Sequence, residues 1–175
     1  MTHPAGLLTR AAARAVPLYL WLVHGLEALT PLFDLSVRLY LANIFWKGGM
    51  VKLSSWMSTV MLFTMVYDVP VLPPEIAAYL STAVELGGSF LLAIGLAGRW
   101  AALSLFGLNI VAALSYGQLS EAALQEAFYW GILFLYFVLH GPGLLSIDAL
   151  LDRFYRQRHT AKGRTYEDLP VPHRV

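Results

Sequence analysis

The chain has 175 residues, of which 58% are hydrophobic and only 13% are charged, and its net charge is +1. Soluble domains carry about a quarter charged residues, and a soluble domain of this size has too much surface for its volume to bury so many apolar side chains. The composition therefore excludes a disordered chain, a coiled coil and a polar secreted scaffold, and it indicates a membrane protein. The absence of cysteine excludes disulfides, iron–sulfur ligation and a thiol redox couple within this chain.

The first apolar stretch, residues 15–29, follows two arginines. A basic start before a short apolar run is also the pattern of a signal peptide. No small-residue cleavage site follows, however, and a proline and two polar residues interrupt the run. We expect an amphipathic helix that lies in the membrane–water interface.

Four segments are candidates for membrane spans, which need about 20 mostly apolar residues each. The first, at about 35–56, is apolar but carries three basic residues, so that a surface helix is the alternative; basic side chains near a helix end can reach the interface. The other three lie at about 76–98, 100–118 and 124–147. Residues 57–69 are too short to span and predict a re-entrant or interfacial segment.

The basic residues predict which side of the membrane each loop occupies. Six of the twelve lie in the last 24 positions, Arg10 and Arg14 precede the first span and Arg38 lies at its start, and Arg99 sits between the second and third spans. With four spans these regions fall on one side, which the positive-inside rule assigns to the cytoplasm. We expect one four-span domain over residues 1–151, a basic cytoplasmic tail over 152–175, and both termini in the cytoplasm.

The expected fold is therefore all-α. It is an integral membrane four-helix bundle with an N-terminal amphipathic interfacial helix and a short re-entrant or interfacial segment between the first two spans. Its first partner is the lipid bilayer. There is no basic patch with interleaved aromatic residues of the kind that binds nucleic acid.

Three polar residues lie at depth within the expected spans, where such residues suggest a functional site. Lys47 lies just past the centre of the first span, and Glu85 lies near the centre of the second. Because these spans run antiparallel, the two charges share a depth and can form an ion pair. Asn109, near the centre of the third span, can hydrogen-bond to either. One interpretation is a ligand or proton site in the membrane; the other is an ion pair that only specifies helix packing.

No metal or haem motif accompanies this cluster. The five histidines show neither H-x-x-x-H nor H-E-x-x-H spacing, and the chain has no Walker loop, no G-x-S-x-G elbow and no G-x-G-x-x-G loop. These patterns leave nucleotide hydrolysis and soluble-type acyl transfer without support, and no cofactor is identified from the residues alone.

Three short motifs occur in order along the spans. Gly48-Gly49-Met50-Val51-Lys52 closes the first, Glu85-Leu86-Gly87-Gly88 lies in the second, and His140-Gly141-Pro142-Gly143 follows the fourth. Over residues 34–151 the chain resembles the DoxX family of small bacterial membrane proteins. The resemblance implies four spans in a bacterial inner membrane with both ends cytoplasmic. It assigns family-motif positions to Arg38, Lys52, Glu85, Gly88, Gly95, Arg99, Ser146 and Asp148. Lys47 and the long segment 57–74 depart from the family pattern.

The same resemblance implies membrane redox chemistry, because one branch of the family looks like a subunit of a thiosulfate:quinone oxidoreductase. The first functional hypothesis is a quinone-associated subunit of a membrane redox complex, with Lys47, Glu85 and Asn109 as the candidate ligand-binding cluster. Electrons would then come from a protein partner. The alternative is a non-enzymatic membrane scaffold or anchor for another protein; a small transporter, which would need a homo-oligomer, is a third hypothesis.

Overall fold

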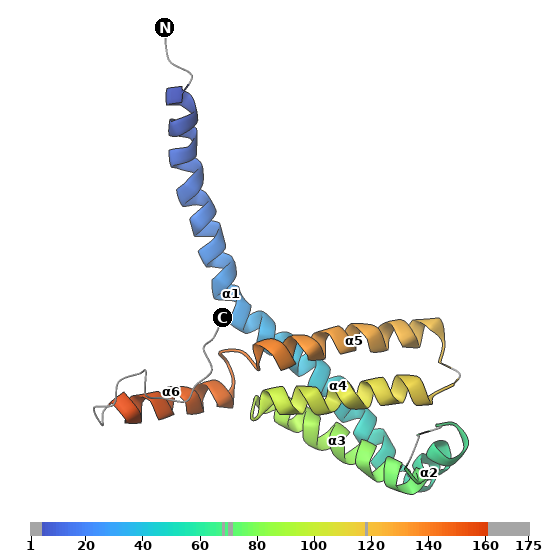
Figure 1. Cartoon of the computed structure of the whole chain (residues 1–175). Coiled ribbons are helices and arrows are strands. Elements are labelled where there is room, and N and C mark those ends of the chain that lie inside the picture. Colours follow the sequence, from blue (N-terminus) through green and yellow to red (C-terminus); the bar gives the residue numbers. More distant parts are fainter. Residues whose placement is uncertain (1–4, 68, 70–71, 118, 161–175) are drawn as a thin grey trace.

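The chain folds into helices joined by short connections. The computed structural model describes residues 5–67, 69, 72–117 and 119–160. Within these residues there are six helices and one isolated β-bridge, between Tyr67 and Tyr116. The helices are α1 (Ala5–Ser54), α2 (Trp56–Met65), α3 (Pro74–Ile94), α4 (Gly98–Ser115), α5 (Glu121–His140) and α6 (Ile147–Thr160) (Figure 1). The all-α prediction is confirmed.

Helix α1 is one continuous helix of 50 residues, which corresponds to about 75 Å. The expected break between an interfacial helix and the first span is absent, so that part of the prediction is wrong. Pro31 lies inside the helix and does not end it; a proline removes one backbone hydrogen bond, and the neighbouring turns remain intact. The N-terminal half of α1 extends away from the other helices (Figure 1), and apart from Val23 and Pro31 residues 16–33 are exposed.

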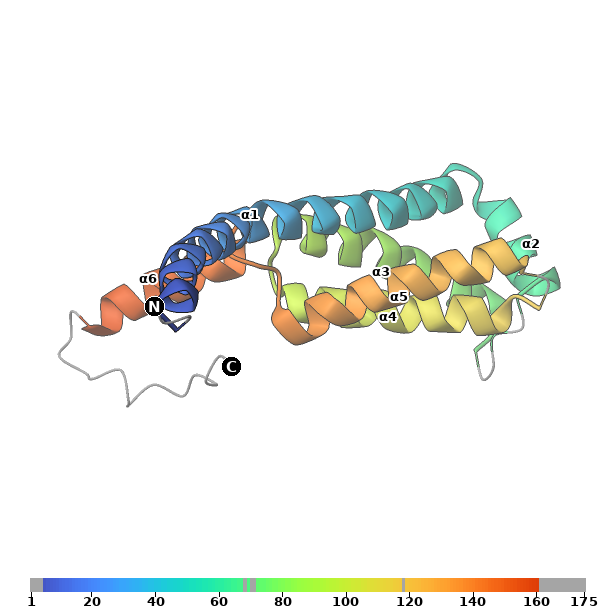
Figure 2. The same cartoon turned by 90° about the horizontal axis from the view of Figure 1, so that it is seen from above.

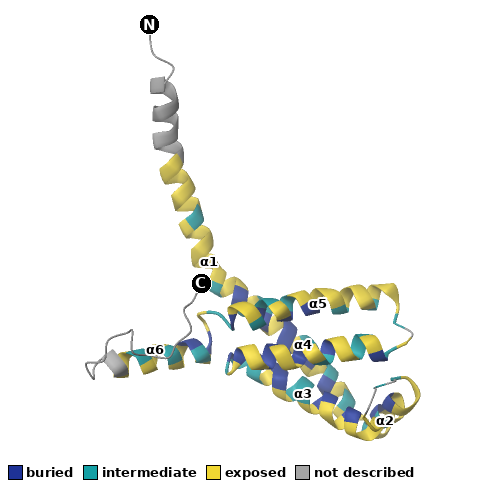
Figure 3. Cartoon of the chain, viewed as in Figure 1, coloured by how far each residue is buried: buried dark blue, intermediate teal, exposed yellow. Residues whose placement is uncertain are grey.

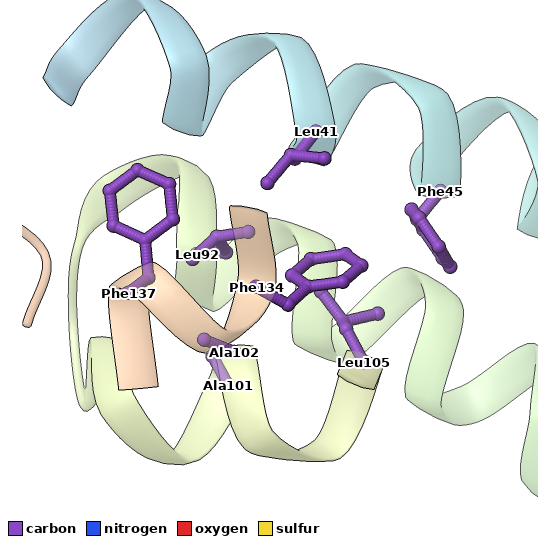
Figure 4. Close-up of a cluster of buried hydrophobic side chains, with 8 residues drawn as sticks. All are labelled: Leu41, Phe45, Leu92, Ala101, Ala102, Leu105, Phe134 and Phe137. Carbon is purple, nitrogen blue, oxygen red and sulfur yellow. The ribbon is translucent and has the colours of Figure 1, made fainter. Parts of the chain in front are cut away.

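The bundle itself consists of the C-terminal half of α1 together with α3, α4 and α5, which run alongside one another (Figure 2). Its centre is a cluster of buried apolar side chains from all four helices (Figure 4). Phe45 of α1 contacts Phe134 of α5 edge to face, with ring centroids 4.9 Å apart. The cluster comprises Leu41, Phe45, Leu92, Ala101, Ala102, Leu105, Phe134 and Phe137.

The outer faces of these helices are exposed (Figure 3). Many of the exposed side chains are large and apolar, as a lipid-facing surface requires. Four helices are long and apolar enough to cross a membrane: Val16–Ser54 within α1, then Pro74–Ile94, Gly98–Ser115 and Glu121–His140. The predicted helical membrane bundle is thereby confirmed.

Two connections differ from the expected boundaries. Helix α5 ends at His140, seven residues before the expected end of the last span, since Gly141 and Gly143 take positive φ angles of 88° and 81° on either side of Pro142. The expected tail begins inside α6, which is helical to Thr160. The rest of that tail, residues 161–175, lies outside the described residues.

The segment after the first span is helix α2, ten residues long. It turns back from the end of α1 and places Thr59 and Phe63 against α3, where Phe63 packs with Ala77 and Ala78. The hydroxyl of Thr59 also donates to the carbonyl oxygen of Lys52 at 2.9 Å. Helix α2 therefore covers one end of the bundle.

Candidate functional site

Glu85 forms an ion pair with Lys52 and not with Lys47. The Nζ atom of Lys52, two residues before the end of α1, lies 2.5 Å and 2.6 Å from the two carboxylate oxygens of Glu85, in the middle of α3. The Lys52 side chain is 17% exposed and that of Glu85 is 12% exposed. The two charges thus compensate each other away from water, as charges buried in a bundle must.

A glycine pair on α1 brings that helix close to Glu85. Gly48 faces the carboxylate, since a Cβ atom built there would lie 3.5 Å from its Oε2 atom. A Cβ atom on Gly49 would lie 2.7 Å from the side chain of Leu86, which is closer than real contacts allow. Small residues at this position therefore permit the approach of α1 to α3 that the ion pair needs.

The predicted Lys47–Glu85 pair is wrong because depth alone does not fix which face of a helix a residue occupies. Lys47 is exposed, and in the described part of the chain it has neither a hydrogen bond nor an ion pair. Five residues separate Lys47 from Lys52, and this turns the two side chains about 140° apart around the helix axis. Gly48 and Lys52 are four residues apart and share a face, which is the sequence signal that identifies the right lysine.

Asn109 does not join the pair either. Its Nδ2 atom donates to the carbonyl oxygen of Ala127 at 2.8 Å, and its side chain is buried between α4 and α5. Gly131 of α5 lies beside it, with an ideal Cβ position 3.5 Å from Nδ2. Asn109 therefore joins α4 to α5 by a hydrogen bond, whereas the ion pair joins α1 to α3.

A pocket of about 430 Å³ opens beside the ion pair, between α2, α3 and α4. Lys52 and Glu85 lie at its wall, Ser81, Ser104 and Ser115 add hydroxyls, and the remaining surface is almost entirely apolar. The apolar lining comes from Phe63, Val69, Leu72, Ala77, Leu80, Val84, Leu103, Gly107, Leu108, Val111 and Ala112. A mostly apolar cavity with a few converging polar groups is the usual form of a small-molecule site.

Tyr67 forms part of the pocket wall, and the sequence analysis did not single it out. Its ring stacks on Phe63 with centroids 4.8 Å apart and meets Tyr116 edge to face at 5.3 Å. Burial, and after it the negative charge of Glu85, raises the pKa of the Tyr67 phenol above its usual value. The phenol is therefore a neutral hydrogen-bond donor at physiological pH. The available signal was an aromatic residue three positions before Pro70 in the 57–74 segment.

Arg38 lies at the opposite end of the bundle from the pocket and is 2% exposed. Its Nη1 donates to the carbonyl oxygen of Pro142 at 2.5 Å and its Nη2 to that of Leu145 at 2.6 Å. Its Nε has no hydrogen-bond partner in the described part of the chain. Arg38 thus ties the connection between α5 and α6 to α1.

Three other positions that the resemblance assigns to the family motif lie near Arg38. Gly95 ends α3 with a φ angle of 70°, and a Cβ atom there would lie 2.5 Å from Ser146 and 2.6 Å from Arg38. The Ser146 hydroxyl donates to the carbonyl oxygen of Gly143 at 2.6 Å and accepts from the amide of Ala149 at 3.2 Å, so that it caps the start of α6. Asp148 accepts from the first amides of α4.

The remaining two motif positions have separate roles. Gly88 lets α4 approach α3, since a Cβ atom there would lie 3.0 Å from the side chain of Leu105. Arg99, the second residue of α4, is exposed and lines a second cavity at the Arg38 end. The positions that the resemblance assigns to the motif therefore comprise the Lys52–Glu85 pair, a cluster around Arg38, and two residues, Gly88 and Arg99, with roles of their own.

Fold and site together define a helical membrane protein with a buried ion pair beside an apolar pocket. The model of the DoxX family matches residues 33–118, which run from the bundle-forming half of α1 to the end of α4. This part of the chain belongs to the DoxX family. No curated protein and no solved structure matches the chain.

Proposed function

We propose that this protein is a quinone-associated subunit of a membrane redox complex, and that the quinone head group binds in the pocket beside Lys52 and Glu85. The observation that carries the proposal is the ion pair at the wall of a mostly apolar cavity of about 430 Å³. Cavities of about 300–1,000 Å³ with few polar groups suit flat apolar ligands. A bound quinone supplies reversible two-electron, two-proton chemistry.

The pocket residues fit a ring that carries two carbonyl groups. Lys52 and Tyr67 are hydrogen-bond donors, and a carbonyl oxygen accepts from either. The stacked rings of Phe63 and Tyr67 offer an aromatic wall for a flat head group. The pocket opens between apolar helices, which gives an isoprenoid tail a path into lipid.

Glu85 is the residue that can hold a transferred proton. Its carboxylate already lies 2.5 Å from the ammonium group of Lys52, so a proton on either group is within hydrogen-bond reach of the other. The apolar surroundings exclude water from this exchange. A carboxylate alone in the same place would be too costly to keep charged.

The proposal includes a partner and a location. The chain contains no cysteine, and we infer that a partner protein delivers the electrons. The DoxX family match supports a bacterial inner membrane, and the arginines at the start of the chain and in its C-terminal part support an orientation with both termini in the cytoplasm. A reporter fused after Val175 should be active only in the cytoplasm, and activity on the other side would contradict this orientation.

The test uses the full chain purified in mild detergent with added short-chain quinone. The unaltered protein should bind the quinone stoichiometrically, and Lys52→Gln should weaken binding about tenfold, as expected when a charged donor is lost. The matched control is Lys47→Gln, because Lys47 lies on the same helix, does not line the pocket and takes no part in the ion pair. Its binding should be unchanged.

Two results would contradict the proposal. The first is an unaltered protein that binds no quinone above the level of the detergent micelle. The second is equal binding by the Lys52→Gln and Lys47→Gln variants. A stoichiometric protein partner that co-purifies without any quinone would favour the scaffold hypothesis in its place.

A further inference from the structure

A second cavity of about 670 Å³ lies at the Arg38 end of the bundle, where α4 begins and α5 ends. Because both helices are candidate spans, this end of the bundle lies at a membrane–water interface. Trp100, 71% exposed, lines the cavity and suits an interface, where tryptophan is enriched. Neither Lys52 nor Glu85 lines this cavity, so it is separate from the pocket proposed for quinone.

One wall of the cavity is acidic. Glu27 and Asp34 lie seven residues apart on α1, which places them on one face of the helix. Asp34 is 8% exposed, and its Oδ1 accepts from the Tyr136 hydroxyl at 2.8 Å. Arg38, one turn further along α1, directs its Nη atoms to the carbonyl oxygens of the α5–α6 connection and not to Asp34. In the described part of the chain Asp34 forms no ion pair within 4 Å, although the charge of Arg38 attracts it from further away.

Arg99 and His140 also line this cavity. Arg99 lies over Gly141, whose ideal Cβ position is 3.3 Å from the Arg99 Nε, and no hydrogen bond or ion pair of Arg99 is formed within the described residues. The ring of His140 stacks on that of Tyr136 at 4.6 Å, and its Nδ1 lies 3.2 Å from the Tyr136 carbonyl oxygen. That contact leaves Nε2 available to a ligand.

Arg99, Glu27 and Asp34 thus line one cavity, and in the described part of the chain Arg99 forms no ion pair with either carboxylate. Arg99 lies beside Gly141, and Asp34 lies beside Gly143, with its Oδ2 3.0 Å from the ideal Cβ position there. The two other acidic residues of the lining are already engaged: Asp148 accepts from backbone amides, and Asp152 pairs with Arg156. Arg99 on one side and Glu27 with Asp34 on the other therefore match a ligand that carries an anion and a cation a few bonds apart.

An apolar groove continues from this cavity. The two share Pro31, Leu144 and Ser146, and the groove has a volume of about 510 Å³. The rest of its lining is Ile94, Leu145, Ile147, Leu150 and Arg153. A dipolar cavity that opens into an apolar groove at the membrane surface matches an amphiphile with a dipolar head and an apolar chain.

We propose that the cavity binds the headgroup of a phospholipid that carries both a primary ammonium and a phosphate, and that one acyl chain occupies the groove. Glu27 and Asp34 bind the ammonium, while Arg99 and His140 bind the phosphate. The Tyr136 hydroxyl holds Asp34 in position. A phospholipid without an ammonium group would leave the acidic wall unpaired, so the site discriminates by headgroup.

The test measures lipid retention by native mass spectrometry of the full chain, released from vesicles that contain equal amounts of phosphatidylethanolamine and phosphatidylglycerol. The unaltered protein should retain phosphatidylethanolamine about tenfold more than phosphatidylglycerol. Arg99→Gln should lower the retention of both lipids, and Glu27→Gln should remove most of the preference. Both side chains are exposed, and Lys47→Gln is the control because Lys47 lines neither cavity nor groove.

Three outcomes would overturn the proposal. Equal retention of the two lipids would show that Glu27 and Asp34 do not recognise the ammonium group. Equal losses in Arg99→Gln and Lys47→Gln would show a general effect of surface charge. Displacement of the lipid by the same concentration of glycerophosphoethanolamine, which has the headgroup and no acyl chain, would show that the groove contributes no binding. Quinone binding is measured separately, and its failure would leave this result unaffected.

Discussion

The carboxylate of Asp148 accepts hydrogen bonds from the backbone amides of Ala97 and Gly98, both at 2.8 Å, although Gly98 lies 50 residues earlier in the chain. The first amides of a helix have no partner within the helix, and they favour a negative charge. In return, the amide of Asp148 donates to the carbonyl oxygen of Gly95 at 3.0 Å. The first turn of α6 therefore holds the turn between α3 and α4 in its strained form, in which Ala97 has a φ angle of 48°.

Replacing Asp148 by alanine should lower the free energy of unfolding by about 1–2 kcal/mol, the usual cost of losing a capping residue. The control is Asp152→Ala on the same helix, since Asp152 forms only a partly exposed pair with Arg156. That change should cost less than about 1 kcal/mol. Thermal unfolding of both variants in detergent measures the difference, and equal effects would contradict the capping role.

The Lys52–Glu85 pair makes a prediction about stability that is independent of any ligand. Glu85→Gln leaves the Lys52 ammonium without its partner and should destabilise the protein by about 3–5 kcal/mol. The double variant Lys52→Met with Glu85→Leu removes both charges and should recover most of that loss. The same thermal unfolding assay measures both variants. A double variant as unstable as the single one would show that the two charges stabilise the protein by more than compensating each other.

Gly95 and Gly87 form a matched pair on α3. Gly95→Ala forces a side chain into a left-handed backbone and against Ser146 and Arg38, and it should cost more than about 2 kcal/mol. Gly87 lies within the helix with open space where a Cβ atom would go, so Gly87→Ala should stabilise the protein by up to about 1 kcal/mol. Stability measured by thermal unfolding should therefore change in opposite directions, and a loss in both variants would refute the packing argument.

Tyr67 predicts a dependence of stability on alkaline pH. Burial and the nearby Glu85 and Tyr116 raise the pKa of its phenol above 10.0. A group whose pKa is raised on folding contributes stability that is complete below its unfolded pKa and is lost as the pH rises through the folded one. The unaltered protein should therefore lose stability above pH 10 more steeply than Tyr67→Phe. Superimposable stability–pH curves for the two proteins would contradict the raised pKa.

Much of the fold could be predicted because span number depends on composition, and lipid tolerates few charged residues in any helix that it surrounds. The depth of Glu85 followed from its place in the second span. Its partner could not be predicted in this way, because Lys47 and Lys52 point to different sides of α1. The position of a residue along a span does not determine the side of the helix on which its side chain lies. The continuity of α1 was not predicted either, since a proline such as Pro31 can end a helix or can lie within a helix that continues past it.

The structure around Arg38 was less predictable for a different reason. Its motif positions were identified, but their contacts join residues about 50 to 107 positions apart. The positive φ angles of the α5–α6 connection and the cap from Asp148 exist only once α1, α4 and α6 have met. Local sequence patterns specify helices and turns, whereas such contacts depend on the assembled bundle.

The unbroken course of α1 has a mechanical consequence. Arg38 and Lys52 are fourteen residues apart on it, which is close to four whole turns, so both point toward the bundle from nearly the same side. An insertion of one residue between them would rotate one relative to the other by about 100°, and the two anchors could no longer engage together. Between these two residues Leu41 and Phe45 pack into the core of the bundle, so a rotation of the protruding N-terminal half would reach the Lys52–Glu85 pair through this whole packed face of α1.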